Sequence, residues 1–135
     1  MLKGIVIGVF HEKDGPKFYR SYPEAFIRKD VLENLIVDGF VETTNKKWYI
    51  KEDKEYTVFG LKAGIKFSIN DFKDYFIVIC VFGDKKKFAA NQIPVTKLIK
   101  SYFDAPVNLK ELNLSEIYNK VNELLRREKL LGGLL

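Results

Sequence analysis

Few residues in the chain have the chemistry of a catalytic or metal-binding site, and His11 is the first to consider. It is the only histidine among 135 residues, and Glu12 and Asp14 follow it closely. Together the three side chains could bind a metal ion or act as an acid-base pair. Asp14 also belongs to an Asp-Gly pair, which favours a tight turn between two strands. We therefore expect a solvated hairpin turn here rather than a reactive loop.

The other candidate groups are one cysteine and two aspartates. Cys80 lies inside the apolar run YFIVICVF, and because nothing charged beside it would lower its pKa, we expect a reduced thiol packed in the core. Asp71 and Asp74, in NDFKD, lie between two strand-like runs, which is typical of a turn. A single His and a single Cys are too few for a zinc site, and the sequence contains no phosphate-binding glycine motif. We predict no catalytic residue, no metal and no cofactor.

The secondary structure that would carry any site can be read from the apolar periodicity. The pattern predicts strands at 2–10, 17–22, 48–50, 55–69 and 74–83, and helices at 24–38, 93–103 and from Asn113 onward. The first helix has Pro23 just before it, and could instead begin at Asp30. Residues 84–92 are predicted to form a loop. Gly60 and Gly64 are expected to bend or bulge the fourth strand.

The order of these elements predicts the sheet. The first and fifth strands are apolar on both faces, so we place them side by side at the centre. The hairpin and the meander then give the order 2-1-5-4-3 in an antiparallel sheet of α/β (α+β) class, within one domain spanning residues 1–135. The first helix crosses one face, and the two C-terminal helices cover the other, where Gly4 and Gly8 would admit one of them.

Charge and hydropathy restrict the partners. The net charge is +5, but the lysines are spread along the chain and only four residues are arginine, so we do not expect nucleic acid as the main partner. The N-terminal apolar stretch is only about seven residues long, and no run approaches the roughly 18 needed to span a bilayer. We expect a cytosolic protein that meets a membrane only peripherally.

The segments LKGIVIGVF and KFYRSY, the helix near 24–38, the three strands of 48–82 and the two C-terminal helices together resemble the longin domain. The resemblance covers nearly the whole chain and is one of topology, within the longin/roadblock superfamily. The opening, a strand, a Gly-Pro turn and a strand ending in Tyr-Pro-Glu, looks like longin-type proteins of the regulatory sort. Roadblock and profilin folds usually begin with a helix. The Lys- and Ile-rich composition would suit an archaeal relative.

The resemblance implies a non-catalytic module of membrane traffic that binds a small Ras-like GTPase or a second longin-like subunit, often as half of a dimer. In such assemblies the first helix and the third strand meet the partner. Carried onto this sequence, the contact residues are Asn34, Asp38, Trp48, Tyr49 and Ile50. The binding would continue the sheet across the interface.

Two features leave alternatives open. Trp48, flanked by lysines, is either a partner anchor or an aromatic half-buried under the first helix, with the lysines preventing edge-to-edge aggregation. Lys85, Lys86 and Lys87 are either solvated or bind an anionic membrane or RNA, which would make binding steeply salt-dependent. An enzyme whose site forms only in an oligomer would lose activity when His11 or Cys80 is changed.

Overall fold

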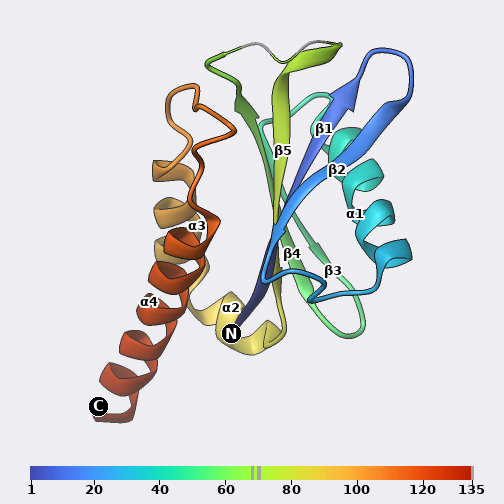
Figure 1. Ribbon diagram of the computed structural model, residues 1–135. Coiled ribbons are helices and arrows are strands. Elements are labelled where there is room, and N and C mark those ends of the chain that lie inside the picture. The colour runs from blue at the N-terminus through green and yellow to red at the C-terminus, as the bar shows by residue number, and fades with distance from the viewer. Residues whose placement is uncertain (68, 70, 135) are drawn as a thin grey trace.

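The fold is an antiparallel sheet with helices on both faces (Figure 1). The structure is a computed structural model that describes residues 1–67, 69 and 71–134, with side chains as far as residue 127. The elements are β1 (Leu2–His11), β2 (Gly15–Tyr22), α1 (Lys29–Glu42), β3 (Trp48–Glu52), β4 (Thr57–Gly64), β5 (Phe72–Phe82), α2 (Lys85–Ala90), α3 (Gln92–Ser101) and α4 (Leu114–Leu134).

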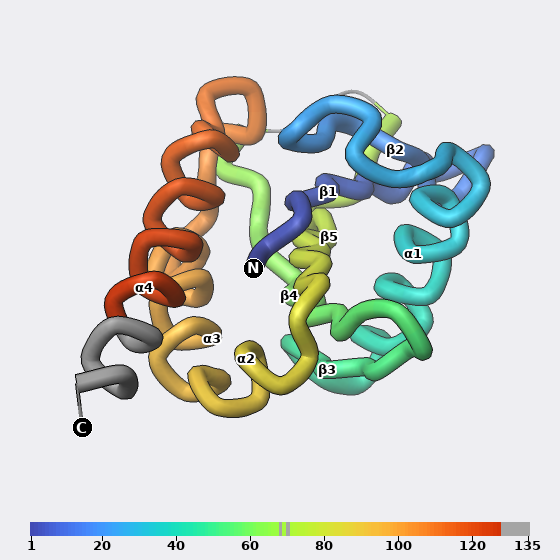
Figure 2. Tube along the Cα trace, turned by 90° about the horizontal axis from the view of Figure 1, so that it is seen from below, coloured from blue at the N-terminus to red at the C-terminus, as the bar shows by residue number. Residues whose placement is uncertain are grey.

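The sheet has the order β2-β1-β5-β4-β3, which confirms the predicted order. β1 and β5 pair antiparallel at the centre, with Ile5 opposite Cys80 and Ile7 opposite Val78. Figure 2 shows α1 on one side of the sheet and α3 and α4 on the other. β2 and β3 are therefore the two edge strands.

Two cores form because the central strands are apolar on both faces. Alternation sends Ile5 and Ile7 toward α3 and α4, and Val6 toward α1. Each such side chain contributes roughly 1.5–3 kcal/mol when it is fully buried. The core under α1 is the smaller, and its buried members are Val6, Leu32, Ile36, Tyr49, Val58, Ile77, Ile79 and Val81.

α1 begins later than the predicted residue 24, close to the alternative start at Asp30. The residues after Pro23 form turns, and Ala25 has a φ of 51°, a left-handed conformation that a right-handed helix cannot contain. These turns place the Phe26 ring over Gly4, where an added Cβ would lie 2.4 Å from the ring. Packing of Phe26 therefore delays the helix.

Gly4 and Gly8 make room for the turn before α1 and for α1 itself, and not for a C-terminal helix, so that part of the prediction is wrong. Gly4 faces Phe26, and Gly8 faces Ile36 of α1. The two glycines lie on the same face of β1 as Val6, which belongs to the core under α1. The close approach that they permit was predicted, but on the opposite face of the sheet.

The residues predicted as a loop at 84–92 contain the short helix α2. The Asp84 carboxylate caps this helix by accepting a hydrogen bond from the Lys87 N–H at 3.0 Å. The cap predicted for the last helix is confirmed, because the Asn113 side-chain oxygen accepts from the Glu116 N–H at 3.1 Å. Within the described residues, no helix has both the length and the apolarity needed to cross a membrane.

Gly60 and Gly64 do not bulge β4, since its pairing with β3 and β5 runs without a register shift. Gly60 instead makes room for the Tyr49 ring of the neighbouring strand: a Cβ on Gly60 would lie 2.0 Å from that ring. A Cβ on Gly64 would meet only Pro106, at 3.4 Å. The register shifts occur in β1.

We predict that Gly60→Ala destabilises the protein by about 1–3 kcal/mol, because the Tyr49 ring must move to admit the methyl group. Gly64→Ala, in the same strand, is the matched control and should change the free energy of unfolding by less than about 0.5 kcal/mol. Urea unfolding of both variants measures the difference. Equal stabilities would contradict the role assigned to Gly60.

Candidate functional site

The outer edge of β3 is open. The Lys62 N–H donates to the Lys47 carbonyl at 2.8 Å, which makes these two residues a hydrogen-bonded pair. Hydrogen-bonded and non-hydrogen-bonded pairs alternate along an antiparallel ladder. The backbone groups of Trp48, Ile50 and Glu52 therefore point away from β4. In the described part of the chain, no strand pairs with that side of β3.

Alternation along β3 separates the two aromatic residues. Tyr49 is 3% exposed and packs beneath α1, while Trp48 is 43% exposed and lies on the other face. The Trp48 ring is 6.2 Å from the Phe59 ring, and the Lys100 ammonium is 4.1 Å from the Trp48 ring centroid. Trp48 is thus not under the first helix, because Tyr49 occupies that position. Burial also raises the pKa of the Tyr49 hydroxyl, so the group stays neutral.

The predicted contact residues of β3 therefore differ in which side-chain and backbone groups they expose to a partner. Trp48 offers both a ring and outward backbone groups, and Ile50 offers outward backbone groups with its side chain packed against the larger core. Tyr49 offers neither, since its side chain is buried and its backbone groups face β4. The partner contact that the resemblance implies for Tyr49 stays a prediction, and in the structure the Tyr49 side chain packs beneath α1.

α1 and β3 form one continuous surface. The Lys51 ammonium donates to both oxygens of the Asp38 carboxylate, at 2.9 and 3.0 Å. This hydrogen bond and the charge of Asp38 raise the pKa of Lys51. Asn34, one turn earlier on α1, lines the same groove of about 420 Å³. The structure therefore brings Asn34 and Asp38 next to β3.

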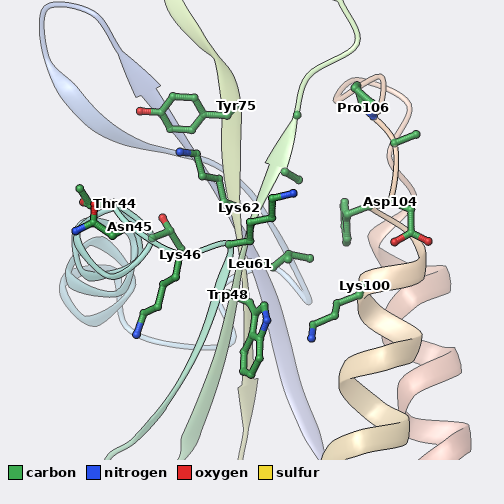
Figure 3. Close-up of a pocket in the computed structure, with 16 residues that line it drawn as sticks. Thr44, Asn45, Lys46, Trp48, Leu61, Lys62, Tyr75, Lys100, Asp104 and Pro106 are labelled. Atoms are coloured by element: carbon green, nitrogen blue, oxygen red, sulfur yellow. The ribbon is translucent and has the colours of Figure 1, made fainter.

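A second cleft, of about 640 Å³, lies at the start of β3 (Figure 3). Its walls come from the loop between α1 and β3, the end of β4, and the segment after α3. Trp48, Lys62, Tyr75 and Lys100 point into this region from different elements. The Lys62 ammonium lies 4.3 Å from the Tyr75 ring centroid, in the same manner as Lys100 over Trp48.

The cleft carries an excess of positive charge. Lys46 is paired with Glu42 at 3.3 Å. Lys47, Lys62 and Lys100 form no ion pair with any described side chain, and Asp104 is the one acidic residue among those that line the cleft. The arrangement can attract an anionic group. It supplies cations and aromatic rings.

Lys85, Lys86 and Lys87 lie apart from this cleft. They form α2, which precedes α3, whereas the cleft lies at the end of α3 (Figure 1). The prediction that they lie in a loop is wrong, because Asp84 caps the helix that contains them. The Lys87 ammonium is 3.5 Å from the Met1 sulfur. These lysines and Trp48 therefore belong to two separate surfaces.

His11 lies at the hairpin, as predicted, and its ring has a structural task. Its Nδ1 accepts hydrogen bonds from the Lys13 and Asp14 N–H groups, at 3.2 and 3.1 Å. Gly15 follows with a φ of 77°, which suits the turn. Asp71 lies in a turn before β5 and Asp74 within β5. Within the described residues, no group of three or more His, Cys, Asp or Glu side chains could hold a metal ion.

No protein-family model matches the chain, and no curated protein shows significant similarity to it. The fold and the site define an antiparallel α/β domain with one open, lysine-rich edge.

We predict that Cys80 does not react with Ellman's reagent in the native protein at about pH 8. The residue is completely buried, and burial raises the pKa of its thiol to about 12. The same chain unfolded in guanidinium chloride is the control and should react fully. Rapid reaction of the native protein would show that the thiol is accessible, and would reopen a chemical role for it.

Proposed function

We propose that the chain is a non-catalytic interaction module of longin type, which binds a small Ras-like GTPase or a second longin-like subunit through α1 and β3. The observation that carries the proposal is an open edge strand with an exposed tryptophan beside an accessible helix. The sheet order on which the longin resemblance rests is also the order that the structure has. We place this activity in the cytosol, at most peripherally at a membrane.

The binding mechanism would add a partner strand to the sheet. Outward N–H and C=O groups of Trp48 and Ile50 would pair with that strand and give affinity. The Trp48 ring would be the anchor, since tryptophan is enriched among residues that dominate binding energy. On α1, Val37 and the 65% exposed Val41 add apolar surface beside Asp38.

The opposite edge is less suited to strand addition. The pairing of β2 with β1 is shifted between Ile7 and Gly8, and such irregularities discourage further pairing. Pro16 in β2 has no N–H to donate. The Arg20 guanidinium donates to the Leu112 carbonyl, which ties this edge to the segment before α4. β3 has a continuous register over its whole length.

We predict that Trp48→Ala weakens binding of the partner by about 2 kcal/mol or more, roughly thirtyfold. The matched control is Phe18→Ala: Phe18 is 48% exposed and lies on the other edge strand, so its loss should leave affinity unchanged. Purified Ras-like GTPases, nucleotide-free or loaded with GDP or a non-hydrolysable GTP analogue, and purified longin-type proteins would be titrated by calorimetry.

Self-association of the chain would be measured in the same series by sedimentation equilibrium, since a second copy is one form of the longin-like partner. If neither a GTPase nor a longin-type protein binds in these titrations, and Trp48→Ala has no effect, the proposal is overturned. If Phe18→Ala reduces the affinity as much as Trp48→Ala does, the contact surface includes the opposite edge of the sheet.

A second candidate function is favoured by one observation. Ile93 is 79% exposed and follows shortly after the lysines of α2. We propose as the alternative that Lys85, Lys86 and Lys87 meet an anionic membrane while Ile93 enters its interface. Exposed isoleucine contributes to binding a bilayer, where apolar burial adds to electrostatic attraction, and adds little to contact with RNA phosphates.

For this alternative we predict binding to phosphatidylserine-containing vesicles and not to pure phosphatidylcholine vesicles, measured by co-sedimentation. Ile93→Asp and Lys86→Glu should each reduce the bound fraction, and added salt should reduce it steeply. Lys73→Glu, an exposed lysine at the start of β5, is the charge-matched control. Equal binding to both kinds of vesicle, or none, would contradict the membrane role.

A further inference from the structure

The cleft at the start of β3 opens onto both faces of the sheet. Trp48 lies opposite Leu61, a member of the core under α3 and α4, so the Trp48–Lys100 pair belongs to that face. Lys62 lies opposite Ile77, a member of the core under α1, so the Lys62–Tyr75 pair belongs to the other face. Figure 3 shows the two lysine-aromatic pairs on either side of the strands.

Each of these lysines is held over an aromatic ring instead of being neutralised by an acid. The ammonium-to-centroid distances are 4.1 Å for Lys100 and 4.3 Å for Lys62, within the range of cation-π contacts. Such a contact positions the cation and leaves its charge available. Each face of the edge therefore presents one positioned cation, and Asp104 is the one carboxylate lining the cleft.

The cleft also continues the open edge of β3. Backbone groups of Trp48 and Ile50 point outward along that edge, as the register requires. At the other end of the cleft, the Val107 N–H donates to the Gly64 carbonyl at 3.1 Å. The segment after α3 thus closes the edge there. Lys62 precedes Gly64 by two residues in β4, so a chain lying along β3 would pass the level of Lys62 before it met this segment.

We propose that this edge binds an extended partner segment with consecutive acidic residues, an inference that rests on the proposed function because it takes β3 as the binding edge. Side chains alternate between the two faces of a strand, so neighbouring acidic residues would meet Lys100 on one face and Lys62 on the other. A free phosphate or a single carboxylate would meet the cation on one face only.

The test uses synthetic peptides as probes for the full chain. The first peptide has a central run of consecutive glutamates between threonine and valine residues. A second has the same composition with the glutamates at alternate positions, and a third has lysine in place of glutamate. We expect the first peptide to bind about tenfold more tightly than the second by calorimetry, and the third not to bind.

Variants on each face test the two cations separately. Lys62→Glu and Lys100→Glu should each weaken binding of the first peptide by about tenfold or more, because each places like charges together. The control is Lys97→Glu, which makes the same charge change on α3 but lines the groove between α3 and α4 instead of the cleft. It should leave affinity within about twofold. Circular dichroism checks that each variant is folded.

Amide hydrogen exchange distinguishes strand pairing from loose electrostatic attraction. Bound peptide should slow exchange of the Trp48 and Ile50 N–H groups, and leave the Phe18 N–H on β2 unchanged. Equal binding of the acidic and basic peptides, or loss of binding in only one of the two face variants, would overturn the proposal.

The outcomes separate this inference from the proposed function. If the acidic peptides fail to bind while a GTPase or longin-type protein binds in a Trp48-dependent manner, the inference is wrong and the proposed function stands. If the acidic peptide binds as expected but no such protein does, the partner class is wrong and the acidic preference of the edge stands.

Discussion

The Tyr49 ring packs against the bare backbone of Gly60, and this contact fixes the register of β3. A Cβ at Gly60 would lie 2.0 Å from the ring, so no other residue fits without movement. The Tyr49 side chain is 3% exposed, and burial of a side chain of this size contributes roughly 1.5–3 kcal/mol. A slip of one residue would exchange the faces of Trp48 and Tyr49 and remove the exposed tryptophan.

Burial of the central strands decides which strands lie at the edges of the sheet, and the two edge strands differ. β1 and β5 are buried on both sides, so they can lie only at the centre, and the meander then leaves β3 with a free side. β2 has a register shift and a proline, while β3 has neither. An open edge is an aggregation hazard unless charged residues guard it. Lys46, Lys47 and Lys51 flank Trp48 in the sequence, and charges of this kind discourage edge-to-edge pairing.

The sheet order could be predicted because burial on both faces of 2–10 and 74–83 leaves few arrangements. The roles of Trp48 and Tyr49 could not, since three apolar residues in a row do not reveal which face is covered. The space at Gly60, directly opposite Tyr49, was the signal that could have decided it. The late start of α1 depends on Phe26 filling the space over Gly4, a tertiary contact that overrides local helix signals. α2 was missed because lysine-rich residues 85–90 look like a loop, although Asp84 was available as a cap.

Under the proposed binding mode, the lysines at the β3 edge would have two effects that follow from the same physics. Between two copies of the chain paired edge to edge at β3, they would place like charges together, which opposes that mode of self-pairing. Against an acidic strand, the same charges would favour pairing, and the cation-π contacts of Lys62 and Lys100 would already hold two of them on opposite faces. In the proposed binding mode, specificity at β3 would come from repulsion of the wrong strand as much as from attraction of the right one.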